Sequence, residues 1–129
     1  MSANDTQIGG SHYKGKSFQP WDWDKFGIGT FEMDILHYIT REKNGVMDLQ
    51  KALHYVEKLK EEYTCHDRRN RIPWALRNAS MGHAIDDYVA EWGMGFERAR
   101  AVWLCVCWQS VADLNELSFR ISNLIQGKP

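Results

Sequence analysis

The sequence predicts an all-α protein that folds as one compact domain. Apolar residues recur at intervals of three and four along residues 46–63 and again along residues 96–125, which is the spacing of amphipathic helices. No segment shows the alternation of apolar and polar residues that a half-buried strand requires. A chain of 129 residues, 43% of them hydrophobic, is long enough to bury one core. We therefore expect two tandem, related helical hairpins packed together, preceded by an irregular N-terminal arm.

The first hairpin is expected within residues 11–63. Its first helix covers residues 30–43 and ends at Asn44-Gly45, a pair that favours a helix end followed by a turn. Its second helix covers residues 46–63. Because the connection between them is so short, the two helices should pack antiparallel.

A connector is expected over residues 64–83. It begins with a polar, basic stretch and continues into a short helix over residues 74–82. Its cations suit a solvated surface, and a strand of nucleic acid stacked on Trp74 is the alternative. We do not expect nucleic acid as a partner, since the formal net charge of the chain is −1. The cations of this stretch are His66, Arg68, Arg69, Arg71 and Arg77.

The second hairpin is expected over residues 84–126, with helices at 96–109 and 111–125. The break between them rests on Ser110 and Asp113, which have the spacing of a capping box. One uninterrupted helix is the alternative, because no glycine separates the two segments.

The two hairpins are predicted to be copies of each other. A shift of 65 positions places Phe31 on Phe96 and Asp48 on Asp113, and the apolar skeleton is kept over both helices. The alternative is that any two amphipathic segments align somewhere. The cationic residues of the first copy are not kept, since Arg41 falls on Val106 and Lys51 on Glu116, so the first copy is the expected host of a site.

The cysteines and the apolar runs indicate a reducing compartment without a membrane. Cys65, Cys105 and Cys107 form an odd set, which suits packing cysteines in the cytoplasm better than a disulfide framework. On a helix Cys105 and Cys107 point in different directions, so we do not expect them to bind one metal ion. The longest apolar run, residues 101–108, is too short to span a membrane, and the first residues do not form a leader.

Residues 10–17 formally match the phosphate-binding loop G-x-x-x-x-G-K-[ST]. The surroundings do not suit such a loop, because a polar stretch precedes it and Pro20 follows where a helix should begin. What remains is a glycine-containing segment in which His12, Lys14 and Lys16 can attract an anion.

A string of motifs between residues 11 and 62, about half the chain, carries a resemblance to a known family. The motifs are Ser11-His12-Tyr13-Lys14 with Pro20-Trp21, Gly27-x-Gly29, His37-Tyr38-Ile39-Thr40-Arg41-x-Lys43-Asn44-Gly45, and Asp48-Leu49-x-Lys51-Ala52-x-x-Tyr55. In this order they resemble a small phage domain family, long of unknown function, whose relatives include an atypical deoxynucleotide kinase without a Walker motif. The chain has Met33-Asp34 where family members carry Gly-Asn, so the resemblance assigns no catalytic residue.

The candidate site is a phosphate-binding surface of the first hairpin. Arg41 can act as a bidentate donor, and Lys16 or Lys51 can act as point charges. Asp34 and Asp48 are candidate ligands of a magnesium ion. The alternative is that these side chains form ordinary solvated helix faces. The full set of candidate nucleotide-binding residues is His12, Tyr13, Lys14, Lys16, His37, Arg41, Lys43, Lys51 and Tyr55.

Two classes of function follow. The first is a phage-type nucleotide-binding protein in the host cytoplasm, whose enzymatic form would be an atypical deoxynucleoside monophosphate kinase that uses magnesium. The second is a non-enzymatic accessory protein that binds a host enzyme or defence component, or a nucleotide sponge. In that case Trp103, Trp108 and Phe119 would form an interface with a host protein or with another copy in a homo-oligomer.

Overall fold

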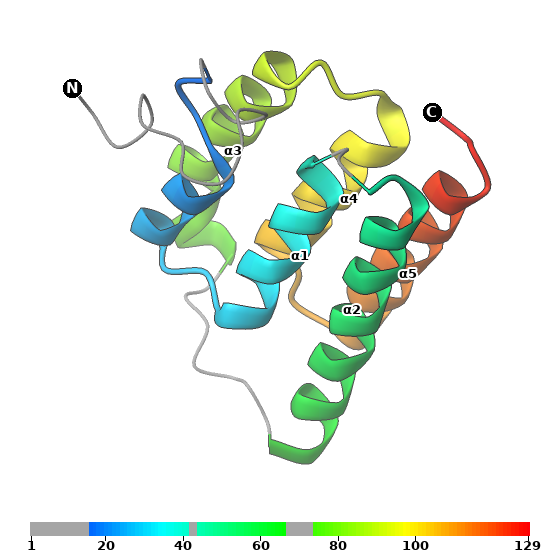
Figure 1. Cartoon of the computed structure of the whole chain (residues 1–129). Helices are drawn as coiled ribbons and strands as arrows, with labels where there is room; N and C mark the ends of the chain where they lie inside the picture. The colour runs from blue at the N-terminus through cyan, green and yellow to red at the C-terminus, as the bar shows by residue number, and fades with distance from the viewer. Residues whose placement is uncertain (1–15, 42–43, 67–73) are drawn as a thin grey trace.

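The computed structural model describes residues 16–41, 44–66 and 74–129, and every regular element in these ranges is helical (Figure 1). The prediction of an all-α fold is confirmed. None of the described helices is long and apolar enough to cross a membrane. The elements are a 3-10 helix η2 (Pro20–Phe26) and the α-helices α1 (Thr30–Thr40), α2 (Val46–His66), α3 (Trp74–Glu91), α4 (Phe96–Cys107) and α5 (Val111–Ile125).

The helices pack in two pairs that share one core. α1 lies on α2 and α4 lies on α5, while α2 also packs along α5 and α1 against α4. α3 contacts α4, and η2 contacts α1. A single cluster of buried side chains joins both pairs, and its largest members include Trp23, Tyr88 and Trp108. Trp23 belongs to η2, Tyr88 to α3, and Trp108 follows α4, so burial of these rings joins those elements to the core.

The break between α4 and α5 is where the capping pattern predicts it. Ser110 is the N-cap of α5, and its Oγ accepts a hydrogen bond from the backbone N–H of Asp113 at 3.3 Å. The carboxylate of Asp113 in turn accepts from the backbone N–H of Gln109 at 2.8 Å. α4 and α5 are therefore two helices, and the alternative of one uninterrupted helix is wrong.

Five elements differ from the sequence prediction. α2 continues to His66 where residue 63 was expected, and α4 ends at Cys107 where residue 109 was expected. α1 ends at Thr40 because Arg41 takes an extended conformation, with φ −77° and ψ 150°. α3 does not stop at residue 82 but continues to Glu91, because Met81, Ile85 and Tyr88 bury one face of a continuous helix. η2 was not predicted, although proline in its first turn favours a short helix there.

The segments that precede α1 and α4 adopt similar conformations. Gly27 and Gly93 both have positive φ, 72° and 60°, a region that favours glycine. Trp23 and Tyr88, which the 65-residue shift superposes, lie edge to face with ring centroids 5.4 Å apart. These correspondences agree with an internal duplication, which stays a prediction.

Candidate functional site

A cavity of about 540 Å³ opens at the end of α1, beside the turn from α3 to α4 and the residues after α5. Figure 1 shows that turn and the C-terminus on the same side of the molecule. We term it the basic cavity. It is lined by Lys16, Thr40, Arg41, Trp92, Gly93, Met94, Gly95, Arg98, Leu124, Gly127, Lys128 and Pro129.

Four of these lining residues are cations, and none is an aspartate or glutamate. The Nζ of Lys16 donates to the backbone carbonyl of Glu91 at 3.1 Å and lies 5.2 Å from the centroid of the Trp92 ring. An Nη of Arg98 donates to the backbone carbonyl of Ile39 at 2.6 Å. Backbone carbonyls thus orient these two cations without cancelling their charge.

Further contacts hold the rim of the basic cavity in place. The backbone N–H and the hydroxyl of Ser17 both donate to the carboxylate of Glu91, the hydroxyl at 2.8 Å. The hydroxyls of Thr40 and Tyr88 share a hydrogen bond at 2.5 Å, which ties the end of α1 to α3. Trp92 donates its Nε1–H to the carbonyl of Phe18 at 2.8 Å. The segment that carries Lys16 is therefore anchored to α3.

Arg41 lies between the basic cavity and a buried carboxylate. The Nε of Arg41 is 3.4 Å from an oxygen of Asp48, a distance suited to charge attraction. This Nε makes no hydrogen bond with any described residue. Asp48 is fully buried and also accepts from the backbone N–H and side-chain amide of Asn44, at 3.2 and 3.3 Å. Asp48 therefore positions Arg41 and neutralises one of the four cations, which leaves a positive excess at the cavity.

The backbone also presents groups that suit an anion. Gly95 is the N-cap of α4 and lines the basic cavity, so the positive end of the dipole of that helix lies at the cavity. The N–H of Glu97 donates to the carbonyl oxygen of Pro129 at 3.3 Å, so an oxygen already occupies part of this helix end. A Cβ added at Gly95 would lie 3.2 Å from the carbonyl carbon of Pro129, and glycine therefore suits this close approach.

A second, shallower cavity of about 390 Å³ lies on the exposed side of α1 and α2. Tyr38 and Tyr55 stack there, with ring centroids 5.9 Å apart. The Nζ of Lys51 lies 5.5 Å and the guanidinium carbon of Arg41 lies 5.8 Å from the centroid of the Tyr38 ring. Lys51 and Tyr55 therefore line this tyrosine cavity and not the basic cavity, while Arg41 lies next to both.

His37 lies half-buried on α1. Burial lowers the pKa of its imidazole below the usual 6.5, the carboxylate of Asp34 opposes that change, and the charge of Arg41 adds to it. The imidazole is therefore neutral at pH 7 and does not add a positive charge to the site.

The structure brings together part of the predicted nucleotide-binding set. Lys16 and Arg41, two of the predicted phosphate-binding residues, both line the basic cavity, whereas Arg98 and Lys128 are cations of that cavity that the sequence patterns did not indicate. Lys128 forms no ion pair with any described carboxylate. The predicted residues His12, Tyr13, Lys14 and Lys43 lie outside the described residues.

The predicted magnesium ligands are not brought into a cluster. Within the part of the chain that the structure describes, no three His, Cys, Asp or Glu side chains gather around one point. Asp48 already accepts from Asn44 and pairs with Arg41. Asp34 lies on α1 close enough to His37 to influence its pKa. Magnesium stays a prediction.

The predicted interface residues have different positions. Trp108 is completely buried and donates its Nε1–H to a carboxylate oxygen of Glu32 at 3.0 Å, so it is a core residue and its assignment to an interface is corrected. Phe119 is 50% exposed, and Trp103 is half-buried with its ring 4.8 Å from the guanidinium carbon of Arg100. Cys105 and Cys107 are buried free thiols, as expected; Cys105 donates to the backbone carbonyl of Glu32.

Comparison with family models, with curated proteins and with solved structures finds no match to this chain. The resemblance to the phage domain family therefore stays a prediction from the motifs. The proposed function is based on the geometry of the basic cavity.

Proposed function

We propose that this protein binds a nucleotide, or a closely related phosphate-bearing small molecule, in the basic cavity. The observation that supports this is the charge of the lining: it has four cations and no aspartate or glutamate, with the carboxylate of Asp48 behind Arg41 and that of Glu91 at the rim. Cations gathered around a concave site repel one another where they outnumber the carboxylates, and a bound anion relieves that repulsion.

The size of the basic cavity suits such a ligand. Sites for small molecules and cofactors are commonly clefts of roughly 300 to 1,000 Å³, and this one measures about 540 Å³. Trp92 and Met94 provide an apolar wall on which a sugar or base can pack, while the cations face the phosphates.

Each cation has a distinct role in the proposal. Arg41 and Arg98 offer planar guanidinium groups that can bind two phosphate oxygens at once. Lys16 and Lys128 act as point charges at the rim. The N–H groups at the start of α4 add a partial positive charge in the same cavity.

Magnesium and phosphoryl transfer extend the proposal. Magnesium in nucleotide sites is usually held by the phosphates, waters and one or two carboxylates, so it can enter with the ligand. Phosphoryl transfer depends mainly on positioning and charge neutralisation, which the cations of the basic cavity would supply. By its motif resemblance the protein would act as an atypical deoxynucleotide kinase or as a nucleotide sponge in the cytoplasm of a phage host.

Isothermal titration calorimetry against deoxynucleoside mono-, di- and triphosphates, with and without magnesium, tests the proposal. We expect binding that weakens as salt is added, because exposed charges are screened. Any ligand that binds is then incubated with ATP and magnesium to detect transfer of phosphate. Absence of binding across the panel would contradict the proposal and favour the hypothesis of a non-enzymatic accessory protein.

A matched pair of lysine variants locates the binding. Lys128→Gln removes an exposed cation of the basic cavity and should weaken binding by roughly twofold to fivefold, the value of one exposed charge contact. Lys58→Gln is the control, because Lys58 is exposed on α2 and pairs with Glu61. Equal affinities of the two variants would place the ligand elsewhere.

A further inference from the structure

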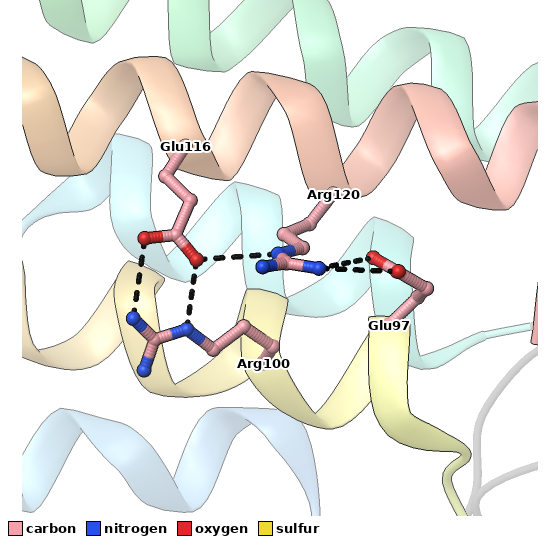
Figure 2. Close-up of polar contacts among 4 residues, drawn as sticks. All are labelled: Glu97, Arg100, Glu116 and Arg120. Carbon is pink, nitrogen blue, oxygen red and sulfur yellow. Dashed lines mark hydrogen bonds and ion pairs between the residues drawn. The ribbon is translucent and has the colours of Figure 1, made fainter.

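Four charged side chains form a connected group across α4 and α5, which we term the Arg–Glu quartet (Figure 2). Arg100 donates to both oxygens of Glu116, at 2.9 and 3.1 Å. Arg120 bridges from Glu116, at 3.2 Å, to both oxygens of Glu97, at 3.2 and 3.3 Å. In order of contact the quartet reads Arg100, Glu116, Arg120, Glu97, so the signs alternate. Hydrogen bonds from Arg100 hold the pKa of Glu116 below its usual range.

Aromatic rings lie around the quartet. The guanidinium carbon of Arg120 is 5.3 Å from the ring centroid of Phe96 and 5.4 Å from that of Phe119. Phe96 is 67% exposed and Phe119 is 50% exposed. Trp103 lies under Arg100 at the other end of the quartet. Exposed aromatic rings beside arginines are the composition that protein interfaces favour over the rest of a surface.

The charge pattern selects the partner. Two cations and two carboxylates cancel, so the surface does not select a strongly acidic or strongly basic partner. A copy of the same quartet laid against it in the reverse direction places opposite signs face to face at all four positions. Arg100 of one copy then faces Glu97 of the other, and Glu116 faces Arg120. This reciprocal pairing is the property of a two-fold, isologous interface.

We propose that the face formed by Phe96, Trp103, Phe119 and the Arg–Glu quartet pairs with the same face of a second copy of this chain in an antiparallel, two-fold dimer. Phe96 and Phe119 become buried in the contact and supply its apolar area. The quartet, whose side chains are partly buried, fixes the direction and register, since complementary charges across an interface contribute more to specificity than to affinity.

Sedimentation equilibrium over about 1 to 100 µM protein tests the dimer, a range that covers micromolar dissociation constants. The chain should dimerise, and Phe119→Ser should weaken the dimer by about tenfold or more. Met47→Ser is the matched control, since Met47 is an exposed apolar residue of α2, 58% accessible, outside the proposed face. A monomer throughout the range, or equal effects of the two substitutions, would overturn the proposal.

A pair of charge reversals tests the register. In the antiparallel dimer Arg120→Glu puts a carboxylate opposite Glu116, and Glu116→Arg puts a cation opposite Arg120, so each variant alone should remain a monomer. Mixed together, they should form a heterodimer, because residue 120 of the first variant then faces residue 116 of the second with opposite charge. Circular dichroism confirms that each variant is folded. Failure of two folded variants to associate on mixing, while the wild type is a dimer, would contradict the antiparallel register.

Discussion

The helix pairs α1/α2 and α4/α5 have matching backbone signals and different polar chemistry. At equivalent positions in the first turn of α1 and of α4, Glu32 is fully buried against Trp108, whereas Glu97 pairs with Arg120 near the surface. The apolar skeleton and the starts of α2 and α5 agree between the pairs, although α2 continues to His66 and α5 ends at Ile125. The two glutamates are the same residue with different partners, and other polar positions carry different side chains, such as Lys51 and Glu116, so each surface can bind different groups.

The cations show the difference most clearly. In α4/α5, Arg100 and Arg120 are matched by Glu116 and Glu97, so the charges of the quartet cancel. At the basic cavity, the four cations of the lining outnumber the carboxylates of Asp48 and Glu91 beside it. A neutral, aromatic surface suits a second copy of the chain, whereas a positive cavity suits an anion.

The largest expected effect concerns the two equivalent glutamates. Glu32→Ala leaves the buried Nε1–H of Trp108 without its acceptor and creates a cavity in the core, so we expect it to lower the free energy of unfolding by about 2 to 4 kcal/mol. Glu97→Ala removes one partner of a mostly buried ion pair, but Arg120 retains Glu116, so we expect a smaller loss of about 1 kcal/mol. Urea unfolding of both variants measures the difference. If both substitutions lowered the free energy of unfolding by the same amount, the contrast drawn between the buried Glu32 and the paired Glu97 would be wrong.

A smaller effect is expected at the two capping aspartates. Asp48 and Asp113 each accept from the backbone N–H four residues earlier. Asp113→Ala should cost about 1 kcal/mol, the usual value of a cap, and Asp48→Ala about 2 kcal/mol, because the buried Asp48 also compensates Arg41. Thermal unfolding compares them; a larger loss at Asp113 would contradict the role given to the Arg41 pair.

The smallest effect is a dependence of stability on pH. Burial lowers the pKa of His37 in the folded protein, so the unfolded chain binds the proton more readily. This contribution to stability is present above the ordinary pKa of 6.5 and is lost as the pH falls from there through the lower folded value. Urea unfolding between about pH 5 and 7 should show that fall. His37→Gln should flatten it, and His54→Gln, at an exposed position on α2, should retain it.

Local signals predicted most of the helices. The expected bounds of α5, residues 111–125, are those observed, because Ser110 and Asp113 form a cap that depends only on neighbouring residues. The sequence pattern predicts that the helix beginning at residue 74 ends at Gly82, but α3 continues to Glu91. Met81 and Ile85 lie on one buried face that extends across that glycine. A buried face can keep a helix intact through a residue that is unfavourable on its own.

The site was less predictable because it depends on contacts between distant segments. Lys16 and Arg41 were indicated by the motifs, but Arg98 and Lys128 reach the basic cavity only because the start of α4 packs beside the residues after α5. The sequence pattern places Trp108 at an interface because it does not reveal the buried hydrogen-bond partner of this ring, Glu32, which is 76 residues away in the sequence. No local pattern shows such a pairing.

Calorimetric titration of two arginine variants tests the central claim, that the uncompensated cations of the basic cavity bind phosphate and the paired cations of the quartet do not. With a deoxynucleotide that binds the wild type, Arg98→Gln should weaken binding by roughly tenfold to a hundredfold, the range for a hydrogen bond to a charged group, because Arg98 is held by a backbone carbonyl and not by a carboxylate. Arg100→Gln should leave the affinity unchanged. An unchanged affinity in Arg98→Gln, or an equal loss in Arg100→Gln, would contradict the account.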